Sequence, residues 1–318
     1  MKHIVYPDSD QTTADLFTGE RLARVHAIGS FDLHVGEPET DAESLRRIGD
    51  ADAVMLGWKM SDDVLTALPN AKIIAFTGIG AANHVNLHIA RERGITVTNT
   101  PGYANDTVAE HTIALMLSVS RQISRLDRDT RAGGWNRGLP SYDLKGKTLG
   151  LIGLGGIGSR TAQLANAFGM RVIAWTRNPT DEKAAIAGVK FESLETVLSE
   201  SHIVSLHLEL NDETQGMIDA KLLNLMDKEA CFINTARGEI VDEVELARML
   251  ESGRLAGAGL DVFSAEPLPA DHAFRRLENV VVTPHTGFNT PEATVAIMDI
   301  AVASIEAFFA GSPINVVT

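Results

Sequence analysis

The 318-residue sequence contains one cysteine, few aromatic residues and far fewer basic than acidic side chains. Cys231 on its own cannot form an intrachain disulfide or a zinc site of paired cysteines, which favours a reducing, cytoplasmic location. The formal net charge of −14 argues against nucleic acid and against an anionic membrane as partners. These absences favour a soluble, acidic protein of the cytoplasm.

Further absences narrow the class. No apolar run approaches the ~20 residues that a bilayer span requires, and the N-terminal residues lack the apolar core of a signal peptide. The sequence has no HExxH motif, and we expect no metal site. Apolar residues make up 44% and charged residues 22%, as in an ordinary globular protein. At roughly 150 residues per domain, this length predicts two domains.

Short β-branched runs alternate with longer stretches of helical spacing, in two successive series. This alternation predicts the α/β class, with two doubly wound, Rossmann-like parallel sheets and a cleft between the two domains. The expected strands of the first series are Lys2–Tyr6, Phe31–Val35, Ala53–Gly57, Lys72–Phe76 and Thr96–Asn99. Those of the second series are Thr148–Gly153, Arg171–Trp175, Val189–Glu192, Ile203–Leu208, Ala230–Thr235, Gly257–Val262 and Asn279–Thr283.

A long helix is expected between the two series. It would begin near Thr107, with Glu110 completing a capping box, and end at 131–134. It either packs against a neighbour, such as a second subunit, or is an ordinary interdomain helix. The last helix, Pro291–Ala310, is expected to return to the first domain. Residues 1–100 plus 287–318 would then form a discontinuous, flavodoxin-like substrate domain, and 101–286 a dinucleotide-binding domain.

Gly153, Gly155 and Gly158 spell a GxGxxG motif that follows an apolar strand and opens a helix. The first glycine permits a tight turn, the second lets the backbone approach a pyrophosphate, and the third lets helix and strand pack closely. The alternative is that the glycines serve only the turn, but the strand–turn–helix context favours a dinucleotide site.

The end of the next strand bears on the choice of cofactor. An NAD site expects a carboxylate there, whereas this strand continues with Thr176 and Arg177 and has no acidic residue before Asp181. A guanidinium can pair with a 2′-phosphate. The sequence therefore predicts a preference for NADP(H), with NAD(H) possible.

Three later segments, each after an expected strand, supply an arginine, a carboxylate and a histidine. They contain Arg237, Glu266 and His285, and parallel strands deliver such loops to one edge of the sheet. An arginine grips a carboxylate through two hydrogen bonds, and a histidine has a proton available near neutral pH. A carboxylate beside the histidine favours the protonated form. This set is what reduction of a keto acid requires.

With these motifs the chain resembles the D-isomer-specific 2-hydroxyacid dehydrogenase family over essentially its whole length, in its glyoxylate/hydroxypyruvate reductase-like branch. The motifs that carry the resemblance are Gly153–Gly158, Asn234–Gly238, Gly259–Phe263 with Glu266–Pro267, Pro284–Gly287, and Thr100–Tyr103 with Val108–His111.

The resemblance implies an NAD(P)H-dependent reduction of a small 2-keto acid to the D-2-hydroxy acid, and a homodimer. Arg237 would bind the substrate carboxylate, His285 would donate the proton, and Glu266 would hold His285 and raise its pKa. The backbone N–H groups of Ile79 and Gly80 would also bind the carboxylate. The positions implied to contact the cofactor are Gly156 and Ile157 at the pyrophosphate, with Thr107, His207, Thr235, Ala236 and Asp261 along the rest of the cofactor.

Some positions depart from the family pattern or stay open. Glu209 stands where the family usually has proline, and a solvent-facing carboxylate is the simplest reading. Lys59 is expected to be a surface lysine rather than a substrate contact, and His111 a buried structural residue. The alternative function is a cofactor-sensing regulatory protein of the same fold with little activity. Oxidation of formate would require glutamine in place of Glu266.

Overall fold

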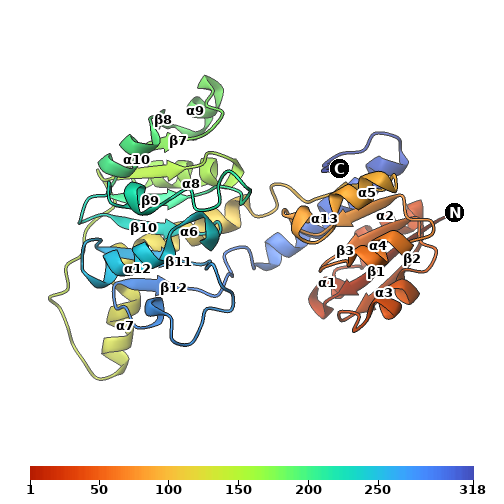
Figure 1. Cartoon of the computed structure of the whole chain (residues 1–318), viewed down its shortest axis with the longest axis horizontal. Helices are drawn as coiled ribbons and strands as arrows, with labels where there is room; N and C mark the ends of the chain where they lie inside the picture. The colour runs from red at the N-terminus through yellow and green to blue at the C-terminus, as the bar shows by residue number, and fades with distance from the viewer. The chain divides into compact units, whose positions relative to one another are not determined.

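The computed structural model describes all 318 residues, which divide into two compact units. Unit 1 comprises Met1–Tyr103 and Thr290–Thr318, and unit 2 comprises Ala104–Asn289. In Figure 1, unit 1 contains both chain termini, and the middle of the chain forms unit 2. The units divide at 103/104 and 289/290, a few residues from the boundaries expected from the sequence.

Unit 1 contains a five-stranded sheet in which all neighbouring strands are parallel. The strand order is β2-β1-β3-β4-β5. Its strands are β1 (Lys2–Ser9), β2 (Gly29–Val35), β3 (Ala53–Leu56), β4 (Ile73–Phe76) and β5 (Thr96–Thr98). Every residue of β3 and β4 is buried, as expected for central strands covered on both faces.

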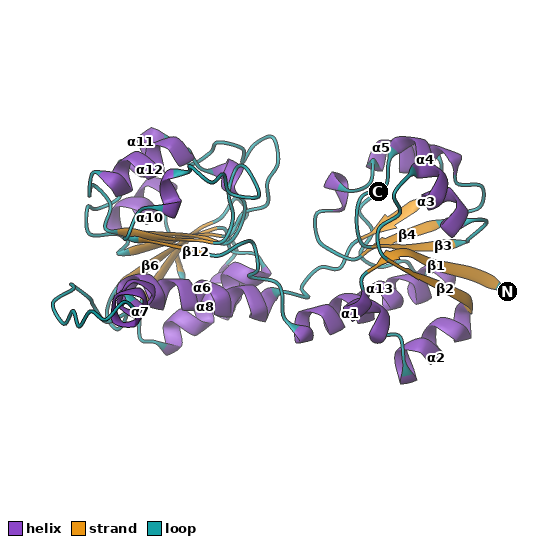
Figure 2. Cartoon of the chain, turned by 90° about the horizontal axis from the view of Figure 1, so that it is seen from below, coloured by secondary structure: helices purple, strands orange, loops and turns teal.

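Helices cover both faces of this sheet (Figure 2). The helices of unit 1 are α1 (Gln11–Asp15), α2 (Gly19–Ile28), α3 (Asp41–Ile48), α4 (Asp62–Ala67), α5 (Leu87–Glu92) and α13 (Pro291–Phe309), with a 3₁₀ turn at Ala81–Asn83. Helices α3, α4 and α5 form one layer, and α2 and α13 lie on the opposite face. Helix α13 starts at a sharp N-cap, where Thr290 accepts a hydrogen bond from the N–H of Ala293 and Pro291 follows.

Unit 2 contains a seven-stranded sheet in the order β12-β11-β10-β9-β6-β7-β8, also entirely parallel. Its strands are β6 (Thr148–Ile152), β7 (Arg171–Trp175), β8 (Lys190–Phe191), β9 (Ile203–Leu206), β10 (Cys231–Asn234), β11 (Gly257–Leu260) and β12 (Val280–Val282). The chain runs outward from β6 in one direction through β7 and β8, and in the other through β9 to β12. The reversal between β6 and β9 is where ligands of such sheets bind.

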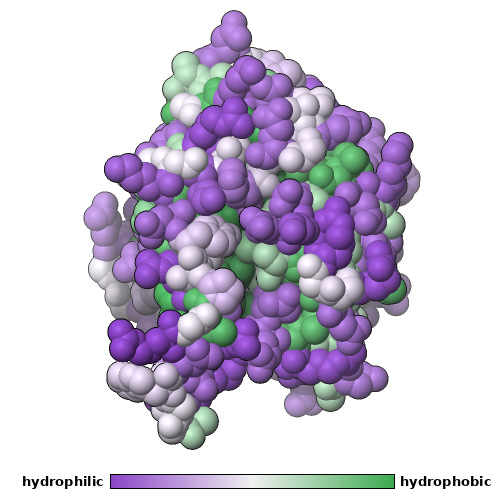
Figure 3. Space-filling view, turned by 90° about the vertical axis from the view of Figure 1, so that its left-hand side faces the viewer, coloured by the Kyte–Doolittle hydropathy of each residue, from purple (hydrophilic) through white to green (hydrophobic).

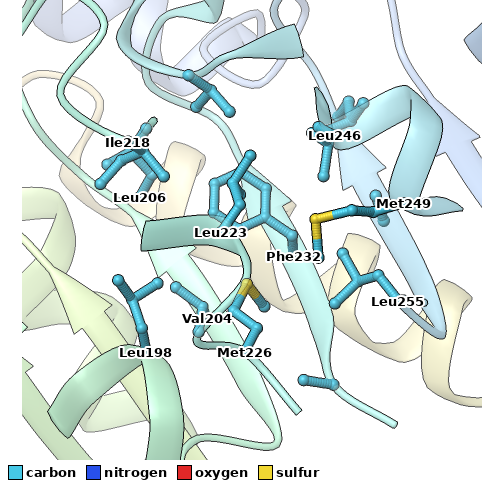
Figure 4. Close-up of a cluster of buried hydrophobic side chains, with 14 of the residues drawn as sticks. Leu198, Val204, Leu206, Ile218, Leu223, Met226, Phe232, Leu246, Met249 and Leu255 are labelled. Carbon is cyan, nitrogen blue, oxygen red and sulfur yellow. The ribbon is translucent and has the colours of Figure 1, made fainter. Parts of the chain in front are cut away.

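Two helical layers cover the sheet of unit 2 (Figure 2). The helices are α6 (Asn105–Ser120), α7 (Ile123–Arg131), α8 (Gly156–Ala167), α9 (Asp181–Ala187), α10 (Leu194–Glu200), α11 (Ala220–Leu223) and α12 (Glu243–Glu251), with 3₁₀ turns at Gly238–Ile240 and Ala273–Arg275. The core under α10, α11 and α12 is drawn in Figure 4, where Leu223, Phe232 and Met249 lie among other buried side chains. The core under α6 and α8 contains Leu115, Met116 and Ala165.

The expected α/β class with two parallel sheets is confirmed, and each expected strand is present. The prediction of a single long helix with a capping box at Thr107 is wrong. The helical segment breaks at Gln122, whose φ of 56° is left-handed, so α6 and α7 are separate helices. Helix α6 begins at Asn105 after Ala104 and has no side-chain cap, so Thr107 lies in its first turn instead of capping it.

The surface is mainly polar. The face seen in Figure 3 is largely hydrophilic, with apolar residues in small scattered patches. None of the helices is long and apolar enough to cross a membrane.

Candidate active site

The three proposed catalytic residues lie after three adjacent strands of unit 2. Arg237 follows β10, Glu266 follows β11, and His285 follows β12. Because the carboxyl ends of parallel strands lie at one edge of the sheet, the three loops start side by side. The three loops therefore lie at one edge of the sheet, as the sequence predicted.

Backbone contacts join these loops directly. The N–H of Asp261 donates to the carbonyl of Asn234 at 2.9 Å, and the N–H of His285 donates to the carbonyl of Asp261 at 2.8 Å. A Cβ atom on Gly238 would overlap the backbone of Phe263 and Ser264. The loop that carries Arg237 is thus packed against the one that carries Glu266, and glycine is required where they touch.

Arg237 is half-buried, and the side chain of Asn234 holds the backbone of its loop. The side chain of Asn234 donates to the carbonyl of Arg237 at 2.9 Å and accepts from the N–H of Ala236 at 2.9 Å. Nη1 of Arg237 donates to the carbonyl of Ala236 at 2.6 Å. No acidic side chain pairs with this guanidinium, so its charge is available to an anionic ligand.

His285 and Glu266 are paired. Nδ1 of His285 lies 2.7 Å from Oε2 of Glu266, and each side chain is 35% exposed. The other carboxylate oxygen of Glu266 accepts from the N–H of Phe263 at 3.0 Å, which fixes the carboxylate. His285 has a left-handed φ of 51°, an uncommon conformation for a non-glycine residue that its two backbone hydrogen bonds sustain.

The pair borders a cavity of about 490 Å³ in unit 2. Much of its lining is apolar, from Phe263, Leu268 and Val282, together with Pro267 and Pro284. Glu266 pairs with Nδ1 of His285, so Nε2 is the ring nitrogen that remains for a bound molecule. The arrangement suits transfer of a proton from an oriented imidazole.

Asp261 anchors the turn that presents His285. Oδ1 accepts from Thr283 Oγ1 at 2.5 Å and from the N–H of Thr286 at 3.0 Å, and Oδ2 accepts from the N–H of Gly287 at 2.8 Å. Nε2 of His111 lies 3.4 Å from Oδ1. Burial alone would raise the pKa of Asp261, but the hydrogen bonds from His111, Thr283 and the two backbone groups lower it to about 2.

His111 and Thr283 were not predicted as partners of Asp261. His111 is half-buried and not buried as expected, and its Nε2 lies 3.0 Å from Oγ1 of Thr283. The structural role expected for His111 thus has defined partners. The only sequence signal was the position of Thr283 two residues before His285. Nothing in the sequence connected either residue with Asp261.

The glycine-rich turn fits a dinucleotide pyrophosphate. Gly153 has φ +101°, and a Cβ there would overlap the carbonyl of His207. A Cβ on Gly158 would overlap the carbonyl of Gly153, whereas one on Gly155 would meet open space. Gly155 is the N-cap of the twelve-residue helix α8 and provides no side-chain cap, so the first N–H groups of α8, including those of Gly156 and Ile157, are left for an anion.

A second cavity, of about 200 Å³, extends from this turn past the end of β7. Its lining includes Gly153, Thr176, Arg177, His207 and Glu209. Burial lowers the pKa of His207 to about 4, so its imidazole is neutral near pH 7 and forms a 2.9 Å hydrogen bond with Ser205. Glu209 is exposed at the cavity rim, as the simplest reading of the sequence expected. Arg177 forms an ion pair with Glu213, which the sequence did not reveal.

The remaining predicted contacts are spread over both units. Thr107 lies in the first turn of α6, two residues after Asn105. The side chain of Asn105 is so close to Gly156 that a Cβ atom on Gly156 would overlap it. Thr235 and Ala236 follow β10, and Oγ1 of Thr235 lies 3.0 Å from that of Thr112. Ile79, Gly80 and Lys59 belong to unit 1: Ile79 and Lys59 are exposed, and Gly80 is half-buried. No three His, Cys, Asp or Glu side chains gather as a metal site.

Residues 113–287 match the model of the D-isomer specific 2-hydroxyacid dehydrogenase NAD-binding domain. The chain belongs to this family and is therefore a nicotinamide-dependent oxidoreductase. A glyoxylate reductase of Thermofilum pendens is 39% identical over 282 residues, which cover 86% of this chain and 83% of that protein. A glycerate dehydrogenase of Methylorubrum extorquens is 38% identical over 289 residues, covering 87% and 89%.

A solved structure is also similar to this chain over nearly its whole length. An acyclic imino acid reductase in complex with NADPH and D-Arg superimposes with a TM-score of 0.87 at 28% identity, covering 99% of this chain and 100% of that one. Proteins similar to this chain thus include a glyoxylate reductase, a glycerate dehydrogenase and a reductase solved with NADPH.

Proposed function

We propose that this enzyme reduces a small 2-keto acid of the glyoxylate or hydroxypyruvate class to the D-2-hydroxy acid, and that it prefers NADPH to NADH. The observation that carries the proposal is the His285–Glu266 pair, held beside the loop of an arginine with no acidic partner. The similar proteins named as glyoxylate reductase and glycerate dehydrogenase support the substrate class.

The chemistry follows from these side chains. Arg237 binds the substrate carboxylate through its guanidinium, which also draws electrons from the neighbouring carbonyl. Glu266 accepts from Nδ1 and so directs Nε2 of His285 toward the carbonyl oxygen. The reduced nicotinamide supplies the hydride to the carbonyl carbon when it is bound, and His285 gives a proton to the oxygen. The reverse reaction returns the proton to Nε2. The contribution of Ile79 and Gly80 to carboxylate binding stays a prediction.

The cofactor preference rests on Arg177. The strand end beside the cavity near Gly153 carries a cation and no carboxylate of its own, so a 2′-phosphate finds a partner there. The test compares kcat/KM for NADPH and NADH in the wild type and in Arg177→Ala. We expect the wild type to favour NADPH and the variant to lose that preference; a wild type that favours NADH would overturn this part of the proposal.

The test of the activity follows oxidation of NADPH over a panel of 2-keto acids, with formate and NADP⁺ as a separate reaction. We expect turnover of glyoxylate or hydroxypyruvate and none of formate. Cofactor binding without turnover of any keto acid would favour the alternative, a cofactor-sensing regulatory protein. The Arg237, Glu266 and His285 set argues for the enzyme, because a sensor needs none of the three.

We also propose a homodimer and a cytoplasmic location. Helix α7 has no buried residue, and Ile123 on it and Trp135 in the following segment are 53% and 80% exposed. Such apolar exposure supports an interface along α7 and the segment after it. Sedimentation of the wild type and of Trp135→Ser tests the dimer, and a wild-type monomer would refute it. The single cysteine supports the location.

A further inference from the structure

Arg177 is engaged by an acidic side chain from another part of unit 2. Its Nη1 pairs with Oε2 of Glu213, and the two side chains are 56% and 67% exposed. An ion pair with this exposure contributes little to stability, so it exchanges readily with another anion. The ion pair therefore affects ligand binding by Arg177 more than it affects the stability of unit 2.

Glu213 lies in a tightly hydrogen-bonded turn. Oδ1 of Asn211 accepts from the N–H groups of Glu213 at 3.0 Å and Thr214 at 3.2 Å. Oγ1 of Thr214 accepts from the N–H of Asn211 at 2.9 Å and donates to the carbonyl of Glu209 at 2.6 Å. Thr214 is only 5% exposed. The backbone of Glu213 is thus fixed, and only its side chain can move away from Arg177.

The turn and the arginine border the same cavity. Arg177 lines it from the end of β7, and Asn211 and Thr214 line it from the opposite segment, with Gly153 at the start of the glycine-rich turn. A dinucleotide whose pyrophosphate lies at the N-terminus of α8 has its adenosine ribose at the end of the second strand, here β7. A 2′-phosphate on that ribose would approach Arg177 and Glu213 together.

We propose that Glu213 sets the strength of the preference for NADP(H) by competing with the 2′-phosphate for Arg177. The phosphate must displace the carboxylate from the guanidinium, and it then lies near a charge of its own sign. Binding of NAD(H), whose 2′-hydroxyl is uncharged, requires little displacement of Glu213 and meets no such repulsion. Glu213 thereby weakens binding of NADP(H) more than binding of NAD(H), and so reduces the ratio of the two affinities. This inference rests on the proposed cofactor site.

The experiment measures binding of adenosine 2′,5′-bisphosphate and of 5′-AMP to the full chain by calorimetry. Glu213→Gln keeps the length of the side chain and removes its charge. Asp212→Asn removes one charge from the neighbouring exposed position and controls for the general field. We expect Glu213→Gln to tighten binding of the bisphosphate about fivefold and to leave 5′-AMP unchanged. Asp212→Asn should change the ratio of the two affinities far less.

Arg177→Ala separates this inference from the cofactor proposal. If Arg177→Ala leaves binding of the bisphosphate unchanged, the proposed role of Arg177 is wrong and the role of Glu213 with it. If Arg177→Ala weakens the bisphosphate selectively but Glu213→Gln alters both nucleotides equally or neither, only the role of Glu213 is wrong. A selective gain in Glu213→Gln that matches a rise in kcat/KM for NADPH relative to NADH supports it.

Discussion

Nδ1 of His285 and Oε2 of Glu266 are 2.7 Å apart, and the second oxygen of the carboxylate is held by the N–H of Phe263. The carboxylate is therefore fixed by the backbone before it orients the imidazole. Since Nδ1 is paired with Glu266, Nε2 is the ring nitrogen left for the proton transfer that we propose.

We expect His285→Gln to lower kcat by about 10²–10⁴-fold, the usual contribution of a positioned acid. The glutamine side chain can donate a hydrogen bond but has no acidic proton to transfer, while the cofactor turn is unchanged. Turnover is measured by oxidation of NADPH and binding by quenching of protein fluorescence. His88→Gln, at an exposed position of unit 1, is the control. Undiminished kcat in His285→Gln would remove His285 from the mechanism.

Arg237→Gln is expected to raise KM for the keto acid and to reduce kcat/KM by roughly 10–100-fold, since a charge-assisted hydrogen bond is lost. The dissociation constant of NADPH should stay the same. Arg46→Gln, which alters an exposed arginine of α3, serves as the control. Equal loss of cofactor and substrate binding would mean that Arg237 stabilises the loop instead of the substrate.

Two glycines of the cofactor turn should respond differently to alanine. Gly153→Ala introduces a Cβ that overlaps the carbonyl of His207 at a left-handed φ, and we expect a loss of about 2–4 kcal/mol in the free energy of unfolding. Gly155→Ala meets no atom of the chain, so stability should be retained while NADPH binds more weakly. Denaturant titration and calorimetry measure the two effects. A destabilised Gly155→Ala with normal affinity would contradict the assignment.

Asp261→Asn tests the anchor of the histidine turn through pH. The pKa of Asp261 is lowered from 3.8 to about 2, so the charged form stabilises the fold by roughly 2 kcal/mol. Because the pKa is lower in the folded state, the stabilisation is fully present above pH ~4 and is lost as the pH falls toward 2. Asp261→Asn should thus be less stable at pH 7, and its difference from wild type should shrink in acid. A difference that is independent of pH would refute this origin.

Local sequence patterns predicted most of the architecture, and long-range contacts account for what they missed. Strands such as β6 and β10 are short and mostly apolar, and Arg237, Glu266 and His285 each follow a strand of the same sheet. The break at Gln122 had no signal, because neither glycine nor proline stands there. The pairs Asp261–His111 and Arg177–Glu213 join residues remote in the chain, and only the assembled sheet brings them together.

The chain enters unit 2 once, after Tyr103, and leaves it once, before Thr290. Every residue proposed to meet the cofactor or transfer the proton therefore lies on one uninterrupted stretch, whereas Ile79 and Gly80 lie outside it. A chimera with a relative needs only two splice points to exchange the flanking segments. Such a chimera would take its cofactor site, Arg237 and His285 from one parent, and Ile79 and Gly80 from the other.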